Sequence, residues 1–314
     1  MPFEKDFKEY LFKIDQSNFS DAALSLFEFQ YKYCNIYQKY ADFHGKSPKN
    51  VKNIEDIPFL PIEFFKNHII KTGNWKEEAI FLSSGTTQSS RSRHYLRDQS
   101  FYHKVCRRIY EGFFSEKIEQ TTFLSLLPSY QEQGNSSLIN MVDSFLDHSK
   151  KDGKYLEDYL GDEMKEEEAV VIGVSYALLD YQEKKIIERP KRVIETGGMK
   201  GRKKEITRSE LHSFLRKKFQ LEEIYSEYGM TELTSQAYGK DGIFKFPAWT
   251  KVLIREINDP FRLCPLGRDG GMNIIDLANV STCAFLETKD IGRMIDENER
   301  FEVLGRFDNS DIRG

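Results

Sequence analysis

Residues 81–93 read FLSSGTTQSSRSR, and the rest of the chain is best interpreted around them. The apolar run AIFL ends at Leu82 and opens into Gly and hydroxyl residues, which Arg91 and Arg93 follow. A loop of this kind at a strand end can turn backbone N–H and side-chain O–H groups toward one point, where a polyphosphate would bind. No Gly-Lys-Ser/Thr closes the loop, so it is not a Walker A loop. A Ser-rich surface turn would explain the same residues and stays open.

Length and composition bound the class of protein. The chain of 314 residues can hold one large domain or two smaller ones, and its 24 Phe and 16 Tyr can build a core. The net charge of −4 gives no reason to expect nucleic acid or anionic lipid as a partner. The N-terminus is charged throughout and no apolar run could span a bilayer, so we expect a cytoplasmic protein.

Apolar residues at helical spacing predict one long helix over residues 20–43, with Ser20 as its N-cap and Gly45 beyond its end. We expect Cys34 to lie in the core there. The four cysteines have neither metal-ligand spacing nor a disulfide pattern. A further helix is expected over residues 99–117, directly after the hydroxyl-rich loop. Thr207 and Glu210 form a capping box that is expected to open another helix, which runs through Phe219.

Strands and helices alternate up to about residue 235, after which strands dominate. The pattern predicts an α/β fold with a mainly parallel sheet flanked by helices and a β-rich C-terminal part. We divide the chain into a helical and extended part (1–80), an α/β core (81–240) and a β-rich part (241–314). Strands are predicted in TTFLSLLP (121–128), at the start of AVVIGVSYALLDY (169–181), in RVIETGGMK (192–200), which ends in a Gly pair, and in IYSEYGMTE (224–232), which runs into a tight turn. The strands of the β-rich part are VLIREIN (252–258), GMNIIDL (271–277), CAFLETKD (283–290) and RFEVLG (300–305). The acidic run 166–168 is interpreted as a solvated face, not a metal site.

Three polar, Gly-containing turns follow predicted strands: Ser83–Thr87, Thr196–Met199 and Tyr228–Glu232. In parallel sheets, ligands bind beyond the carboxyl ends of strands. One shared ligand explains the three turns better than three unrelated turns would.

The ordered segments SSGTTQSS, YSEYGMTE, ETKDIG and LGRFDNSDIRG resemble the core motifs of the adenylate-forming superfamily, which includes acyl-CoA synthetases, firefly luciferase and peptide-synthetase adenylation domains. The resemblance covers roughly residues 80 to 314. The short length, ETGGMKGR and the ending DNSDIRG are most similar to the LuxE-type acyl-protein synthetases, which are long-chain-fatty-acid–protein ligases.

The resemblance implies a role for each matching residue. The β- and γ-phosphates of ATP would be held by Ser83, Ser84, Gly85, Thr86 and Thr87. The adenine would lie along Gly197 and Gly198, with Tyr228 stacked near the base, and Gly229 and Met230 completing the turn. Thr231 would reach the α-phosphate, Glu232 would bind Mg²⁺, Asp290 would take the ribose hydroxyls, and Arg306 would contact ribose or phosphate. Asp308 would sit at the hinge before a C-terminal lid.

The chemistry of the residue types agrees with two of these roles. A carboxylate such as Glu232 is a hard oxygen ligand of the kind Mg²⁺ prefers. Asp290 can accept two charge-assisted hydrogen bonds from a vicinal diol. Simpler interpretations stay open: Asp290 could cap a turn before Gly292, Arg306 could pair with a surface acid, and the two glycines could form only a turn.

The resemblance implies an AMP-forming ligase. A carboxylic acid, expected to be fatty, attacks the α-phosphorus of ATP, and the acyl group then passes to a protein thiol or carrier. An acyl-CoA ligase of the phenylacetate type and a non-catalytic nucleotide- or partner-binding remnant stay open. The sequence ends after the hinge-like motif, so we expect no C-terminal lid. Cys283 is expected to be a buried strand residue sharing a face with Phe285 and Glu287, with the acceptor thiol on another molecule.

Overall fold

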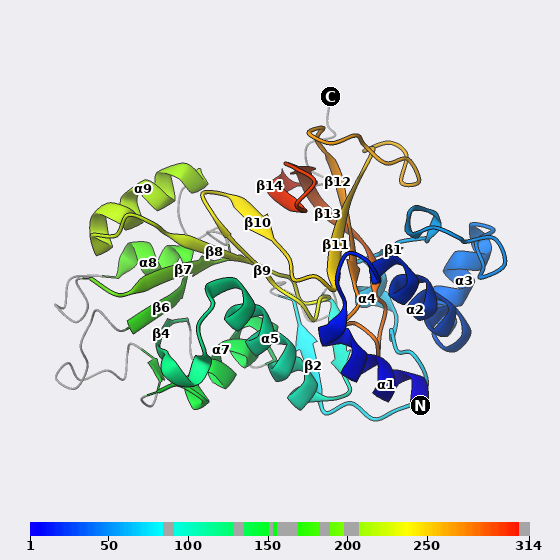
Figure 1. The fold of residues 1–314 in the computed structure, drawn as a ribbon, viewed down its shortest axis with the longest axis horizontal. Coiled ribbons are helices and arrows are strands. Elements are labelled where there is room, and N and C mark those ends of the chain that lie inside the picture. The colour runs from blue at the N-terminus through cyan, green and yellow to red at the C-terminus, as the bar shows by residue number, and fades with distance from the viewer. Residues whose placement is uncertain are drawn as a thin grey trace. The chain divides into compact units, whose positions relative to one another are not determined.

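The computed structural model describes residues 1–83, 91–127, 135–150, 153–155, 169–181, 189–197 and 207–307. Within them the chain forms two compact units (Figure 1). Unit 1 comprises residues 1–105, 230–235 and 245–314, and unit 2 comprises residues 106–229 and 236–244. Among the described helices, none is long and apolar enough to cross a bilayer.

Unit 1 begins with short helices: α1 (Pro2–Tyr10), α2 (Phe19–Tyr33), α3 (Asn35–Phe43) and α4 (Phe64–Asn67), with 3₁₀ turns at Leu11–Lys13 and Ile54–Asp56. The prediction of one helix over residues 20–43 was therefore wrong. The helix is interrupted at Cys34, whose backbone is extended at φ −105° and ψ 96°. Apolar spacing continues through the break, so the pattern gave no sign of it. Cys34 is buried, as predicted, and Tyr37 of α3 stacks on Phe285 with ring centroids 5.8 Å apart.

The β-rich C-terminal part forms the sheet of unit 1. Its antiparallel strands lie in the order β11 (Thr250–Arg255), β12 (Gly270–Asp276), β13 (Phe285–Met294) and β14 (Arg300–Arg306). The short strand β1 (Leu60–Pro61) pairs with β13 in parallel. Phe27 of α2 packs edge-on against Phe285, so the N-terminal helices cover the start of β13. The predicted β-rich part is confirmed.

The hydroxyl-rich segment lies in a hairpin of unit 1. Strand β2 (Ala79–Leu82) pairs antiparallel with β3 (Arg93–Leu96) in a separate two-stranded sheet. We expected the segment to lead straight into a helix, and this was wrong because β3, only four residues long, comes first. Residues 84–90, between the two strands, lie outside the described residues.

Unit 2 carries the parallel sheet. Its strands lie in the order β5 (Lys154–Tyr155), β4 (Thr122–Leu126), β6 (Ala169–Val174), β7 (Arg192–Thr196), β8 (Tyr225–Tyr228), β9 (Ala237–Lys240) and β10 (Ile243–Lys245). Strands β5 to β8 are parallel, and β9 runs antiparallel to β8. Strand β6 is buried along its whole length, as expected of a parallel strand covered on both faces.

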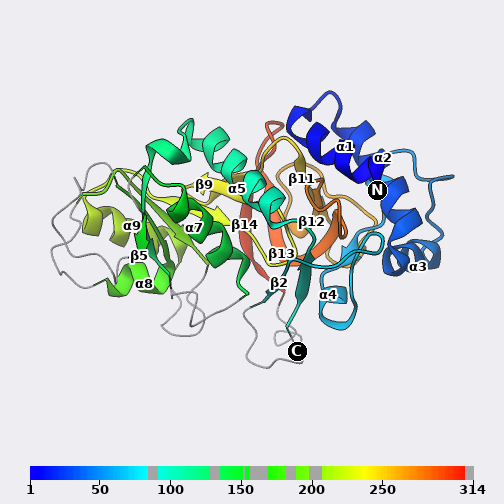
Figure 2. The same ribbon diagram turned by 90° about the horizontal axis from the view of Figure 1, so that it is seen from below.

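Helices flank both faces of this sheet. They are α5 (Gln99–Phe114), α7 (Ser137–Asp147), α8 (Ser175–Asp180) and α9 (Arg208–Phe219), with a 3₁₀ turn at Ile118–Gln120. The first residues of α5 belong to unit 1 and the rest to unit 2. Figures 1 and 2 show α8 and α9 on one side of the strands and α7 on the other. Leu211 and Leu215 of α9 pack into one apolar layer, while Phe145 of α7 packs on Phe123 on the opposite face. The capping box predicted from Thr207 and Glu210 is present. The α/β class predicted from the sequence is confirmed.

Candidate functional site

The turn that follows β8 holds the two residues expected to touch the α-phosphate and the metal. Thr231 is half-buried, and Glu232 is only 5% exposed. The Glu232 carbonyl accepts a hydrogen bond of 2.8 Å from the Asn279 amide. Below the turn, the buried Asp276 carboxylate accepts from the backbone N–H groups of Thr234 at 2.9 Å and Ser235 at 2.8 Å. The backbone of this turn is therefore fixed by buried side chains.

The protein only partly compensates the negative charge of the buried Glu232 carboxylate. Burial raises its pKa above the ordinary value, and the negative charge of Asp290 raises it further. A hydrogen bond from Ser92 and the positive charge of Arg306 act in the opposite direction without cancelling the rise. A buried carboxylate with too few compensating partners gains from a nearby cation.

Asp290 and Arg306, two other predicted site residues, are register partners on β13 and β14. Arg306 Nε lies 3.8 Å from Asp290 Oδ1, and the arginine side chain is 60% exposed. Asp290 lies inside a strand, so it does not cap a turn before Gly292. Arg306 does pair with an acid, and that acid is the proposed ribose ligand itself. Unit 1 therefore brings together three of the predicted site residues, Glu232, Asp290 and Arg306.

The Glu232 carboxylate is suited to bind Mg²⁺. In the part of the chain that the structure describes, no group of three or more His, Cys, Asp or Glu side chains is arranged to hold a metal ion. Mg²⁺ usually takes only one or two carboxylates from the protein, because water and substrate phosphates supply its other ligands. Glu232 offers such a carboxylate, and its raised pKa is of the kind that a bound cation would lower.

Ser83 is the described member of the hydroxyl-rich segment. Its N–H donates to the Ser92 carbonyl at 3.1 Å, and its hydroxyl accepts from the Ser92 N–H at 2.9 Å. Ser83 and Ser92 thus close the base of the β2–β3 hairpin. The phosphate roles predicted for Ser84, Gly85, Thr86 and Thr87 fall outside the described residues, as does the hinge role of Asp308.

In unit 2, Gly197 directly follows β7. It has φ +65°, a backbone conformation that side chains other than glycine rarely adopt. Among the residues that the structure describes, none has a heavy atom within 4 Å of a Cβ built at this position. The Ser175 hydroxyl lies 2.5 Å from the Gly197 carbonyl and holds the turn in place. Gly198 lies outside the described residues.

Tyr228 and Gly229 follow at the end of β8, also in unit 2. The Tyr228 ring lies 5.8 Å from Phe244. A Cβ on Gly229 would come within 2.5 Å of a carboxylate oxygen of Glu227, so a larger residue there would require the Glu227 side chain to move. Met230, the next residue, is half-buried. Burial raises the pKa of Glu227 to about 7, against a hydrogen bond from Thr196 that lowers it.

Sequence reasoning missed several polar residues beside these turns. Glu195, buried in β7, accepts a hydrogen bond of 2.7 Å from Ser226, and His212 of α9 lies 3.6 Å from the same oxygen. Glu195 stands two residues before Gly197, and a carboxylate inside a buried strand was a usable signal. His94 was missed as well, because nothing near it in the sequence marks it.

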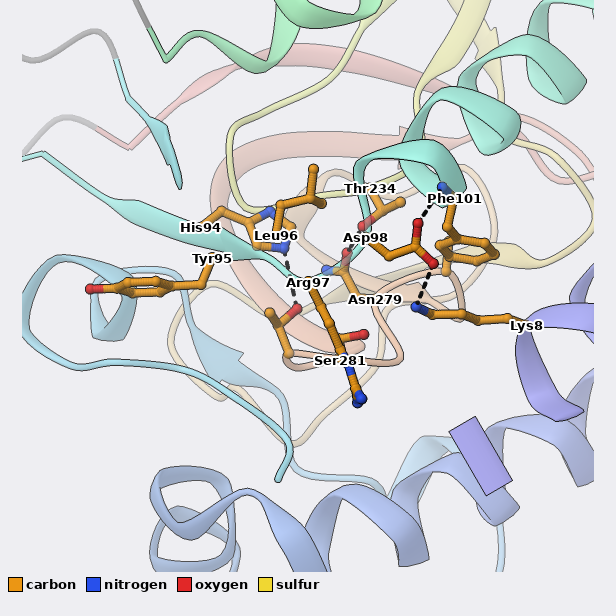
Figure 3. A pocket seen from close by; sticks show the side chains of 12 residues that line it. Lys8, His94, Tyr95, Leu96, Arg97, Asp98, Phe101, Thr234, Asn279 and Ser281 are labelled. Carbon is orange, nitrogen blue, oxygen red and sulfur yellow. Dashed lines mark hydrogen bonds and ion pairs between the residues drawn. The ribbon is translucent and has the colours of Figure 1, made fainter. Parts of the chain in front are cut away.

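A small pocket in unit 1 lies beside His94 (Figure 3). Lys8 and Asp98, which line it, are paired at 3.4 Å. Its water-accessible volume of about 20 Å³ is enough for about one water molecule. None of the residues predicted to form the nucleotide site lines this pocket, and it is too small for a nucleotide.

Cys283 lies just before β13, which begins at Phe285. The prediction that Cys283 belongs to this strand and shares a face with Phe285 was therefore wrong. It is fully buried, and burial raises the pKa of its thiol well above the ordinary value. An acceptor thiol must be accessible and readily ionised. The structure supports the interpretation of Cys283 as a core residue.

The fold is similar to that of ligases with solved structures. The crystal structure of an open conformation of 2-hydroxyisobutyryl-CoA ligase in complex with 2-HIB-AMP and CoA has a TM-score of 0.64 to this chain and 14% identity, covering 92% of this chain and 74% of that one. ATP-bound MatB from Rhodopseudomonas palustris has a TM-score of 0.50 and 16% identity, covering 73% of this chain and 48% of that one. At these identities the similarity concerns the fold.

A curated relative is the long-chain-fatty-acid–luciferin-component ligase of Photorhabdus luminescens. It is 41% identical over 65 residues, which are 20% of this chain and 55% of the relative. The chain therefore spans about half the length of the curated relative that it matches. No protein-family model matches the chain.

Proposed function

We propose that the protein activates a carboxylic acid with ATP, forming acyl-AMP and pyrophosphate. The observation that carries the proposal is the grouping of the buried Glu232 with Asp290 and Arg306 in unit 1. In a fold shared with ligases solved with acyl-AMP or ATP, these side chains match the roles expected for metal, ribose and phosphate contact.

The work of the protein in such a reaction is positioning and charge neutralisation. The acid's carboxylate oxygen attacks the α-phosphorus, the bond from that phosphorus to the bridging oxygen breaks, and pyrophosphate leaves. Glu232 would hold Mg²⁺, which when bound would supply positive charge to the phosphate oxygens. Arg306 projects a largely exposed guanidinium, which can neutralise phosphate charge or bind the ribose. Asp290 would accept hydrogen bonds from the ribose hydroxyls.

For the second step, we propose transfer of the acyl group to a thiol on another protein or a carrier. The partial match to a luciferin-component ligase supports a fatty acid as the substrate. The burial of Cys283 supports an acceptor in trans, since that thiol is not accessible. A second candidate is transfer to coenzyme A, favoured by the fold neighbour solved with CoA.

Pyrophosphate exchange with a panel of fatty, aromatic and amino acids tests the first step. We expect exchange with a fatty or aromatic acid, and no exchange with any acid would leave only the non-catalytic alternative. Adding coenzyme A then decides the second step. Its consumption would favour the ligase candidate, and acyl-AMP that persists until a thiol protein is added would favour transfer in trans. The protein is also incubated with a labelled acid and ATP. Stable label on the wild type that is absent from Cys283→Ser would show that Cys283 is the acceptor and contradict transfer to another protein.

A further inference from the structure

Two buried polar side chains stand at the start of β3 and reach the Thr231–Glu232 turn. Ser92 directly precedes β3 and His94 lies within it, and each side chain is only 2% exposed. The Ser92 hydroxyl donates to the Glu232 carboxylate. His94 Nδ1 lies 2.7 Å from the Thr231 carbonyl, across 137 residues of sequence. Ser92 just before β3 and His94 within it therefore contact Glu232, the metal-ligand candidate, and Thr231, the residue before it.

The contacts of His94 define its tautomer. A carbonyl oxygen only accepts, so Nδ1 must carry the proton that bonds to Thr231. The other ring nitrogen, Nε2, lies 3.2 Å from the Thr282 hydroxyl, along the dashed line that leaves His94 in Figure 3. In the neutral ring Nε2 accepts the hydroxyl proton. Burial lowers the pKa of His94 to about 4, which agrees with a neutral ring.

Packing alone does not require an imidazole here. The ring lies edge-on to Phe65 and Phe81, with centroids 5.9 and 6.4 Å away. An apolar side chain of similar size would pack between these rings without placing polar nitrogens in the interior, but it would leave the Thr231 carbonyl without its partner. The imidazole therefore serves the turn.

We propose that His94 is a positioning residue of the site: its Nδ1–H fixes the Thr231 carbonyl and thereby the direction in which Glu232 presents its carboxylate. This inference rests on the proposed function for the role of Glu232. Asn279 holds the next carbonyl, that of Glu232, at 2.8 Å. The carbonyls of Thr231 and Glu232 are thus each hydrogen-bonded to a side chain from a different segment. These bonds hold the two peptide groups on either side of the Glu232 Cα. Sites for phosphate and metal depend on such support, because small misplacements of a ligand weaken binding.

A matched set of variants separates the donor from the bulk of the ring. The amide nitrogen of Asn can occupy the place of Nδ1, that of Gln lies nearer the place of Nε2, and Leu has no donor. We expect His94→Leu and His94→Gln to lower pyrophosphate exchange by roughly 10- to 100-fold and to raise the Mg²⁺ concentration for half-maximal rate. His94→Asn should recover most of both. His148→Leu removes another imidazole-to-carbonyl contact, of 2.8 Å to Ser144, and serves as the control without effect.

Melting temperatures measured on the same proteins decide whether the role is only structural. Losses that follow melting temperature alone, with Asn no better than Leu, would overturn the proposal, as would wild-type exchange in His94→Leu. The tautomer is an independent readout: ¹⁵N shifts of the imidazole in the full chain should show Nδ1–H, and an Nε2–H ring would contradict the geometry.

Should the wild type exchange with no acid at all, the proposed function fails while the inference about His94 stays testable. Calorimetric titration with Mg²⁺ and ATP then decides it. Binding weakened in His94→Leu and kept in His94→Asn supports the positioning role. Equal binding by wild type and both variants, or no binding by any of them, overturns it.

Discussion

Two buried glutamates of this chain, one in each unit, show how differently a carboxylate can be held. Glu195 in β7 is 4% exposed, and Glu232 after β8 is 5% exposed. Burial acts to raise the pKa of Glu195, but the nearby His212 and Arg208 and hydrogen bonds from Ser226 and Ser175 hold it below its ordinary value. The pKa of Glu232 is raised instead, because Ser92 and the charge of Arg306 do not offset burial.

The difference teaches how to separate a structural carboxylate from a functional one at equal burial. A carboxylate whose charge is fully met by protein groups has no need of a ligand, and removing it breaks the network around it. A carboxylate whose charge is only partly met stores an unfavourable interaction that a bound cation would relieve. Glu195 belongs to the first kind, and we propose that Glu232 belongs to the second.

The largest effect is expected on folding, at Glu195. Replacing it by Leu leaves His212, Ser226 and Ser175 without their shared partner. We expect the free energy of unfolding to fall by about 3–5 kcal/mol. Urea denaturation measures this loss. Glu223→Gln is the matched control, since Glu223 is paired with Lys240 on the surface, and it should change stability by less than about 1 kcal/mol. A loss at Glu195 no larger than that of the control would break the comparison.

Glu232 should show the opposite behaviour. Glu232→Gln keeps the shape of the side chain and removes its charge, so we expect pyrophosphate exchange to fall roughly 100-fold, about 2.7 kcal/mol of transition-state stabilisation. Stability should be unchanged or slightly higher, because a poorly compensated buried charge is gone. Exchange measured at limiting Mg²⁺ beside a thermal melt checks both halves. A variant that exchanges like the wild type would remove Glu232 from the metal site.

Local signals allowed much of the fold to be predicted from the sequence. The capping box at Thr207, the apolar run of β6 and the strands of the C-terminal part are each encoded by a few neighbouring residues. The break at Cys34 was not predictable in this way, since apolar spacing runs through it. The short strand β3 was missed because RHYL has no apolar alternation of its own.

The site divides along the same line. Glu232, Asp290 and Arg306 could be proposed from the sequence because each stands in a short ordered motif. Glu195 and His94 were not, because their meaning lies in partners far along the chain. Ser226 is 31 residues from Glu195, and Thr231 is 137 residues from His94. Residues that support a site from a distance leave no local pattern.

Glu227, beside Gly229, adds a third carboxylate whose effect depends on pH. The folded protein holds its proton up to a pKa of about 7, whereas the ordinary value is 4.5. Its contribution to stability is therefore full below about pH 4.5 and is lost as pH rises through 7. Between pH 5 and pH 8 the wild type should lose about 2 kcal/mol of unfolding free energy that Glu227→Gln, which has no proton to lose there, keeps. Urea midpoints across this range measure it, and a difference that is constant with pH would mean that the carboxyl titrates normally.

The smallest expected effect concerns Asp290, which raises the pKa of Glu232 and is the proposed ribose ligand. Asp290→Asn keeps the shape of the side chain but replaces two charged acceptors by one neutral acceptor. We expect the KM for ATP to rise roughly tenfold, about 1.4 kcal/mol, with little change in kcat. The ribose role predicts a further result, because wild type should prefer ATP to 2′-deoxy-ATP and the variant should lose most of this preference.

Arg306 is largely exposed, so the loss of its partner at 3.8 Å should change stability little. If Asp290 acts only through Glu232, both nucleotides will be affected equally in the variant, and the change will appear in the Mg²⁺ dependence instead. The ratio of the two nucleotides therefore decides whether the two carboxylates have one role or two.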